Sequence, residues 1–296
     1  MCGWARASLV AWTCLLLGLF LFGCPKRAER DSAELRSAFE AGDSAFQNPL
    51  DRSGVEQALE AWGDALSFAP HEPRLSTRLA RGHLARAMLV DLSQRDLDLR
   101  MARQRGMDCL GSDNSWVGRS QRPRPAELQA IRVEQVGCVT WANLAWARWL
   151  EHRGVTGAGI DLEPLEALAR RAVELDPDYD RGRSRAVLGL VLSLSSRDEQ
   201  GLEESARELL AAQRARPERH VVDLDLARRV YQPLGRQEEW QESLSRVLSG
   251  TDSSEPFEAL ENQWARAQAQ DALLRGFVRP GEKNGSNSRE VRESGD

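Results

Sequence analysis

The sequence is poor in the residues from which catalytic and metal centres are usually built. Its four histidines lie at positions 71, 83, 152 and 220, and none of them forms a metal-binding pair along a helix. It contains no phosphate-binding glycine loop and no serine in a nucleophile elbow. Paired carboxylates occur throughout, as in any charged helical protein, so they select no site. We therefore expect a binding or adaptor protein with no catalytic residues, no metal and no other cofactor.

Long runs of β-branched residues are also scarce, whereas leucine, alanine, arginine and glutamate are abundant. These four residue types favour helices. The chain has 40 basic and 45 acidic residues, which is a formal net charge of −5 at pH 7. Proteins that bind nucleic-acid phosphates usually carry an excess of positive charge. The composition therefore predicts an all-α protein and argues against a nucleic-acid partner.

One long apolar run lies at the N-terminus, in residues 7–22. Arg6 precedes this run, and the sequence Leu-Phe-Gly-Cys at its end matches a bacterial lipobox. We expect residues 1–23 to be a lipoprotein signal peptide and residues 24–30 to be a tether. Lipidation at Cys24 would anchor the chain in a lipid membrane, on the periplasmic side of either the inner or the outer membrane. An uncleaved membrane anchor is the alternative, although about 20 apolar residues are needed to span a bilayer.

A repeated helical pattern organises the rest of the chain. Leu165, Ala169 and Ala172 fall on one face of a helix, and Pro177 cannot continue that helix. The same spacing recurs in Ala58, Trp62, Ala65 and Pro70, and again in Ser205, Leu209, Ala212 and Pro217. Small residues on such a face let a second helix approach closely. The pattern resembles the second helix of a tetratricopeptide repeat.

The predicted fold is therefore an all-α, tetratricopeptide-repeat-like α-solenoid of degenerate helical hairpins in residues 31–278. Helices are expected at about 31–46, 54–68, 72–90, 91–107, 126–152, 165–175, 180–194, 199–215, 219–234, 237–249 and 255–276. Residues 111–125 are predicted to form a loop, because they mix Gly, Ser, Asp, Arg and Pro. The last helix should cap the solenoid, with Leu260, Trp264 and Ala267 on one face. Residues 279–296 are expected to be a disordered tail.

Two cysteines, Cys109 and Cys138, lie beyond the signal peptide. An oxidising compartment permits a disulfide between them. Cys138 also falls on an apolar helical stripe, where a free cysteine packs as a small hydrophobe. The sequence leaves both alternatives open.

The helix expected at 126–152 is unusually rich in tryptophan. Core packing is the simplest interpretation, and we prefer it for Trp141. Tryptophans beyond the needs of one helix contact, with an asparagine beside them, also suit the mostly apolar wall of a ligand site. The candidate ligand-binding or partner-binding residues are Trp141, Asn143, Trp146 and Trp264.

Three stretches resemble one known family. Residues 138–152, CVTWANLAWARWLEH, resemble the Trp/Ala-rich central helix of the T component of tripartite ATP-independent periplasmic (TRAP) transporters. Residues 172–182, AVELDPDYDRG, are similar to that family's segment A-L-E-L-D-P-x-Y-x-x-G, and residues 223–274 follow its ending. The resemblance implies a helical lipoprotein that binds the periplasmic solute-binding protein of a TRAP-type transporter. It also implies a passage for an apolar ligand.

A function of another class has the same sequence features. A helical-repeat lipoprotein that acts as a scaffold in cell-envelope or secretion-complex assembly would also carry a lipobox and degenerate repeats. Association into a homo-oligomer is compatible with either function. Neighbouring genes for a solute-binding protein and a permease would favour transport over the scaffold.

Overall fold

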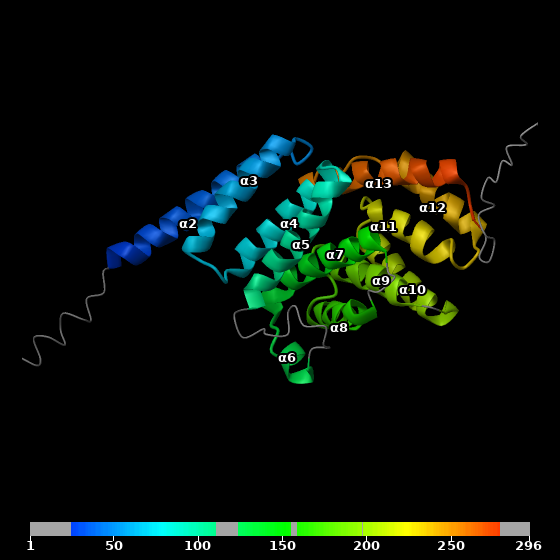
Figure 1. Cartoon of the computed structure of the whole chain (residues 1–296), viewed down its shortest axis with the longest axis horizontal. Helices are drawn as coiled ribbons and strands as arrows, with labels where there is room; N and C mark the ends of the chain where they lie inside the picture. The colour runs from blue at the N-terminus through cyan, green and yellow to red at the C-terminus, as the bar shows by residue number, and fades with distance from the viewer. Residues whose placement is uncertain (1–24, 111–123, 155–158, 197, 279–296) are drawn as a thin grey trace, which may run out of the picture.

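The computed structural model describes residues 25–110, 124–154, 159–196 and 198–278, and within these ranges it contains helices and no strand. This confirms the all-α prediction. The expected signal peptide, Cys24 and the expected tail at 279–296 lie outside the described residues. Figure 1 shows an elongated helical body, with the first helices at one end and α12 and the C-terminal part of α13 at the other.

The N-terminal helices pack in chain order, each against the next. They are α2 (Pro25–Ala45), α3 (Arg52–Asp64), α4 (Pro73–Leu89) and α5 (Leu92–Met107). Asp51, Glu72 and Asp91 cap the last three, and each side chain accepts a backbone N–H from the first turn. Helix α2 begins at Pro25, so residues 25–30 of the expected tether are helical.

The prediction of a single helix at 126–152 is wrong. The chain forms α6 (Pro125–Gln129), then the 3₁₀ turn η3 (Val133–Gln135), and then α7 (Val136–Arg153). The break comes at Arg132, whose backbone is extended, with φ −101° and ψ 165°. Arg171 of α8 (Gly159–Leu175) donates hydrogen bonds to the carbonyl oxygens of Leu128 and Ile131, at 3.0 and 3.1 Å. A contact from a distant helix therefore satisfies carbonyls that a continuous helix would have paired internally.

Helix α7 lies at the centre of the fold. It packs against α4, α5, α8 and α9 (Arg183–Ser195), and every residue from 136 to 148 is buried. The approach of α5 is especially close, because a Cβ added at Gly106 would lie 2.7 Å from the Cβ of Ala142. Any larger residue at position 106 would force these two helices apart.

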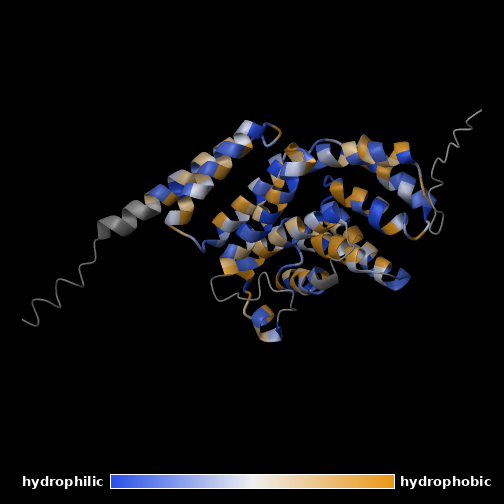
Figure 2. Ribbon diagram, viewed as in Figure 1, coloured by the Kyte–Doolittle hydropathy of each residue, from blue (hydrophilic) through white to orange (hydrophobic). Residues whose placement is uncertain are grey.

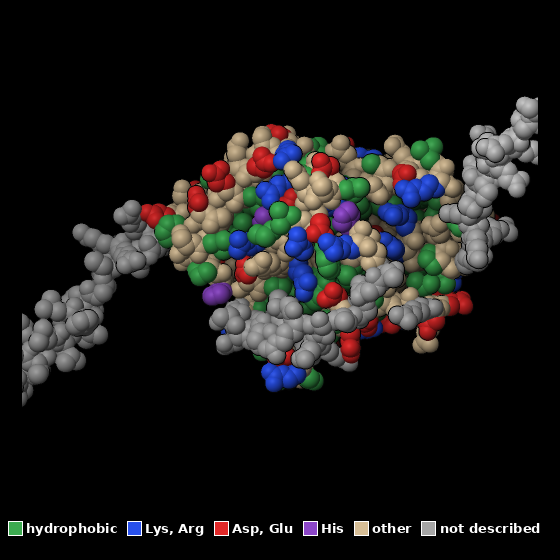
Figure 3. Space-filling view, in the orientation of Figure 1, with side chains coloured by type: hydrophobic (Ala, Val, Ile, Leu, Met, Phe, Trp, Pro, Cys, Tyr) green, Lys and Arg blue, Asp and Glu red, His purple; other side chains and the backbone are tan. Residues whose placement is uncertain are grey.

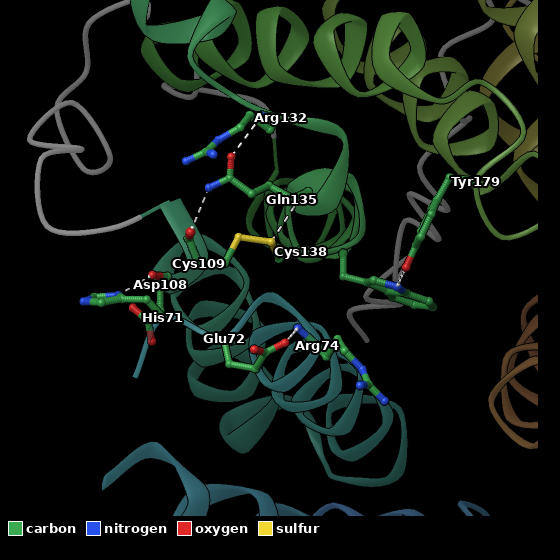
Figure 4. The surroundings of a disulfide bond; sticks show 10 residues. His71, Glu72, Arg74, Asp108, Cys109, Arg132, Gln135, Cys138 and Tyr179 are labelled. Atoms are coloured by element: carbon green, nitrogen blue, oxygen red, sulfur yellow. Dashed lines mark hydrogen bonds between the residues drawn. A yellow bond between two sulfur atoms is a disulfide. The ribbon is translucent and has the colours of Figure 1, made fainter. Parts of the chain in front are cut away.

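A disulfide joins this central helix to the end of the preceding hairpin. Cys109, in the 3₁₀ turn η2 (Asp108–Leu110), is bonded to Cys138 of α7, with 6.6 Å between their Cα atoms. Figure 4 shows Gln135 beside this bond, where its amide donates to the carbonyl oxygen of Cys109 at 2.9 Å. Of the two alternatives left open by the sequence, the structure has the disulfide.

The repeated stripes are buried as predicted. Each residue that we placed on a stripe has an exposed fraction of 2% or less: Ala58, Trp62, Ala65, Leu165, Ala169, Ala172, Ser205, Leu209 and Ala212. The chain turns after α8 through Asp180, Arg181 and Gly182, which have φ values of 45°, 54° and 82°. It then enters α9 and α10 (Glu199–Ala215), which pack against each other. Sequential packing of this kind agrees with helical hairpins, whereas the tetratricopeptide-like arrangement stays a prediction.

The C-terminal region contains a π-helix. The helix expected at 219–234 is instead α11 (Val221–Asp225) followed by the π-helical segment η4 (Leu226–Tyr231). Here the N–H of Gln232 donates to the carbonyl of Ala227, five residues earlier. Helices α12 (Gln237–Ser249) and α13 (Pro256–Arg275) follow.

The predicted face of α13 is only partly correct. Leu260 is buried and Trp264 is half-buried, but Ala267 is exposed. Polar residues take several of the other buried positions: Glu261 pairs with Arg183 of α9, and Asn262 accepts the backbone N–H of His220 at 2.9 Å. Since these residues are stabilised by partners far away in the sequence, apolar spacing alone could not identify the buried face. Helix α13 contacts α4, α11 and α12.

Apolar side chains form two buried clusters. The larger one is built from α3 to α9 with Phe257 and Leu260 of α13, and the smaller one from α10 to α13. Figure 2 shows hydrophobic and hydrophilic residues alternating along most of the ribbons, as expected of amphipathic helices. None of the helices in the described ranges has the length and apolar character that crossing a bilayer requires.

Candidate functional site

The four candidate residues do not lie together in one site. Trp141, Asn143 and Trp146 are all on α7 and buried, whereas Trp264 is on α13 and half-buried. Trp264 lines a surface cavity to which none of the other three contributes. The structure therefore separates a buried group on α7 from an open pocket beside α13.

Trp141 is surrounded by the core. Its ring packs edge-on against Phe257, with 4.9 Å between the ring centroids, and the guanidinium of Arg183 lies 4.4 Å from its centroid. Its indole N–H donates to the hydroxyl of Tyr179 at 3.2 Å. Its ring and its indole N–H both have partners within the protein, which agrees with the core packing that we preferred for it.

Asn143 and Trp146 differ from Trp141 because their side-chain polar atoms have no partner among the residues that the structure describes. Asn143 is 0% exposed, yet neither its amide nitrogen nor its amide oxygen makes a hydrogen bond within these residues. The indole N–H of Trp146, one helical turn away, is also unpartnered. A buried amide without partners costs about 1–3 kcal/mol. An unpaired group of this kind is a reason to look for a bound polar atom from another molecule.

Arg103 of α5 is a neighbour of Trp146 that sequence analysis missed. Its guanidinium lies 3.4 Å from the centroid of the Trp146 ring, and it has no ion pair with any described residue. Burial lowers the pKa of Arg103 to about 10, although the negative charge of Asp161 acts to raise it. Arg103 shares a helix face with Leu99, and this spacing was the one available sign that it points inward. The α5–α7 contact thus places a cation against an indole ring whose N–H has no partner among the described residues.

The cavity beside Trp264, which we call the arginine pocket, has a volume of about 150 Å³. Five helical segments from different parts of the chain contribute to it: α4, α5, α7, η4 and α13. Its residues are Leu84, Ala87, Met88, Arg95, Leu99, Arg148, Glu151, His152, Arg228, Arg229, Trp264 and Gln268. Figure 3 shows basic side chains gathered near the centre of one face of the molecule.

Two of the pocket's arginines are neutralised by carboxylates. Arg148 makes paired hydrogen bonds to Asp225 at 2.8 and 2.7 Å and a further one to Glu151 at 2.7 Å. Arg229 donates to the other oxygen of Glu151 at 2.8 Å. Burial alone would raise the pKa of Glu151, but the charges of Arg148 and Arg229 lower it to about 2. These four side chains are a structural unit that joins α7 to the C-terminal segments.

The other two arginines have no carboxylate partner among the described residues. Arg95 donates to the backbone carbonyls of Ala87 and Val90, at 2.9 and 3.4 Å. Within the described residues Arg228 makes one hydrogen bond, of 3.4 Å, to the side-chain oxygen of Gln268. Burial lowers the pKa of Arg228. The positive charge of the neighbouring Arg229 lowers it further, whereas the negative charge of Glu151 acts in the opposite direction. The pocket therefore carries an excess of two positive charges beside a wall of apolar side chains.

A family model described as TRAP transporter T-component matches residues 66–276, which is more than half of the chain. The match includes the α7 group, the disulfide and the arginine pocket. No curated protein matches the chain. The matched family is a component of a transport system and not a known enzyme family.

Proposed function

Because this chain belongs to the TRAP transporter T-component family, we propose that it is a lipid-anchored periplasmic protein that binds the solute-binding subunit of a TRAP-type transporter. The family match over residues 66–276 carries this proposal. The helical body supports it, because stacked helices offer extended surfaces for a protein partner. The same match favours transport over a scaffold in envelope or secretion-complex assembly, since that function predicts no relation to a transporter.

Co-purification tests the docking. The full chain, expressed in its native envelope and captured under conditions that preserve other lipoprotein complexes, should recover a TRAP-type solute-binding protein. Recovery of secretin or outer-membrane assembly proteins in its place would support the scaffold. A preparation that contains neither partner would count against docking.

Anchoring through Cys24 is a separate part of the proposal. The apolar run and the lipobox at the N-terminus support it. Replacing Cys24 with alanine should move the protein from the membrane fraction to the soluble fraction of the periplasm. If Cys24→Ala remains fully membrane-bound, the anchor lies elsewhere.

We propose, as a third part, that the protein helps to handle an apolar ligand. The amide of Asn143, which has no partner among the described residues, supports this as one of the few polar groups that such a site contains. We expect Asn143→Leu to keep or raise the free energy of unfolding, because leucine has a similar size and leaves no polar group unpaired. Transport by the intact system should nevertheless fall. A variant that is both more stable and fully active would show that the amide has no role.

Asn262→Leu is the matched control for this substitution. Asn262 is also 0% exposed, but its side chain accepts the N–H of His220 and donates to the carbonyl of Glu218 at 2.8 Å. Loss of these two bonds leaves the buried N–H of His220 without its partner and removes a second bond to the carbonyl of Glu218, so this variant should be destabilised. Opposite signs of the two stability changes would distinguish a functional asparagine from a structural one.

The tetratricopeptide-like arrangement is also proposed. The buried stripes of α3, α8 and α10 and the packing of each helix on its neighbour support it. Limited proteolysis should release fragments cut between hairpins, because repeat proteins are stabilised by contacts between adjacent units. Cleavage confined to the chain ends under all conditions would instead indicate one indivisible core.

A further inference from the structure

We propose that the arginine pocket binds a phosphate monoester carried on a small apolar group. The inference goes beyond docking to a solute-binding subunit, because it concerns binding by this chain alone. It depends on three features of the pocket: its unbalanced charge, its apolar wall and its size.

The charge of the pocket favours a dianion. Four arginines line it, and the carboxylates of Glu151 and Asp225 balance two of them, Arg148 and Arg229. The charges of Arg95 and Arg228 remain without a carboxylate. A phosphate monoester carries about −1.5 to −2 charges at pH 7. It therefore matches this excess more closely than a singly charged sulfate monoester or carboxylate does.

The donors of the pocket also suit a phosphoryl group. A guanidinium presents five N–H donors in a planar fork that matches phosphate oxygens. Among the described residues, Arg228 makes a single long hydrogen bond and Arg95 makes two bonds to backbone carbonyls, so both keep donors that no group in this part of the chain accepts. Because Arg228 is partly buried, its interaction with an anion is screened less than that of a fully exposed side chain.

The apolar part of the lining favours an apolar body on the ligand. Leu84, Ala87, Met88 and Leu99 of α4 and α5 line the pocket together with Trp264 of α13, and the guanidinium of Arg148 lies 5.3 Å from the centroid of the Trp264 ring. The volume of about 150 Å³ is comparable to that of an engineered apolar cavity in another protein that binds benzene. A phenyl-sized group would therefore fill this volume, and because the cavity is open to the surface, its phosphoryl group would extend from it toward the arginines of the lining.

Phenyl phosphate is the probe for a soluble ester of this kind, and isothermal titration calorimetry with the full chain measures its binding. Phenyl sulfate has nearly the same shape with one negative charge, and inorganic phosphate has the charge without the apolar group. We expect phenyl phosphate to bind at least about tenfold more tightly than either of them. Equal affinity for phenyl sulfate would overturn the charge argument, and equal affinity for inorganic phosphate would overturn the role of the apolar wall.

A lipid headgroup could supply the same chemistry. Vesicles that contain phosphatidic acid in phosphatidylcholine present a phosphate monoester on a lipid. Co-sedimentation of the protein with these vesicles measures its binding to the lipid-borne ester. Competition by phenyl phosphate would show that the lipid uses the arginine pocket. Binding in either experiment supports the proposal, and its absence in both refutes it.

Two variants test the pocket by independent means. Arg228→Gln removes an unbalanced charge, and Gln268→Glu supplies a carboxylate to the same guanidinium without removing any arginine. Each should weaken phenyl phosphate binding at least about tenfold. Arg275→Gln, on the exposed part of α13, makes the same change of charge outside the pocket and should bind as the unmodified chain does. Circular dichroism verifies that each variant is folded. Unchanged binding by a folded Gln268→Glu variant would exclude Arg228 from the site.

Discussion

The buried ion pair between α9 and α13 allows a sharp test of what holds the C-terminal helix in place. Arg183 and Glu261 are 3% and 1% exposed, and two parallel hydrogen bonds of 2.9 and 2.8 Å join them. Glu261→Gln removes the negative charge while keeping the shape of the side chain. The guanidinium of Arg183 then stays buried without its main counterion.

The size of the stability loss in Glu261→Gln depends on which charged groups remain around Arg183. Removing one partner from a buried ion pair usually costs about 3–5 kcal/mol, because the other charge is left uncompensated. Asp180 also accepts a hydrogen bond from Arg183 at 2.6 Å, and its side chain is 36% exposed. This second carboxylate compensates part of the charge, so we expect a loss of about 3 kcal/mol, at the lower end of that range.

A double variant separates the lost charge from lost packing. Arg183→Met with Glu261→Leu leaves no charge from this pair in the interior, and methionine can still pack on the ring of Trp141. We expect the double variant to recover at least half of the stability that Glu261→Gln loses, because apolar replacements of buried pairs are often neutral or stabilising.

Urea unfolding monitored by circular dichroism measures both changes as shifts of the midpoint at an unchanged slope. Asp271→Asn is the control, since Asp271 and Arg275 form an exposed pair worth less than about 1 kcal/mol. A loss below about 1 kcal/mol for Glu261→Gln would refute the reasoning. A double variant that is no more stable than Glu261→Gln would also refute it, because the loss of stability would then come from packing and not from the unpaired charge.

Three further predictions concern other parts of the fold. Burial alone would raise the pKa of Glu258, but Arg216 and Arg219 lower it from 4.5 to about 2. The stability from this carboxylate is complete above about pH 4.5 and is lost as the pH falls toward 2, so urea midpoints between pH 5 and 3 should change less in Glu258→Gln than in the unmodified chain. Reduction of the disulfide, which closes a loop across 29 positions, should cost about 3–4 kcal/mol. An equal melting temperature with and without reductant would contradict this estimate. Ala172→Leu should lose about 1–3 kcal/mol in thermal melts, because Ala172 is 2% exposed and a larger side chain would overpack its helix contact. A stable Ala172→Leu variant would show that this contact has spare room.

Helix positions and most buried faces could be predicted from the sequence. The stripe of α8 is an example: Leu165, Ala169 and Ala172 are all buried, and the helix ends at Leu175, two residues before Pro177. The family was also recognisable, because short segments of α7 and of the turn after α8 carry its resemblance. Each of these features depends on residues within a few turns of one another, and helical periodicity brings such residues together whatever the rest of the chain does.

The tertiary structure alone decided the features that depend on distant partners. Arg171 reaches the carbonyls that end α6, and Arg183 makes Glu261 a buried residue. The disulfide and the arginine pocket likewise join residues that are far apart in the chain, and the missing partners of Asn143 become visible only when all its neighbours are placed. Burial of a polar group costs free energy unless a partner lies within hydrogen-bond distance. That distance is a property of the packed helices, so local spacing in the sequence could not reveal it.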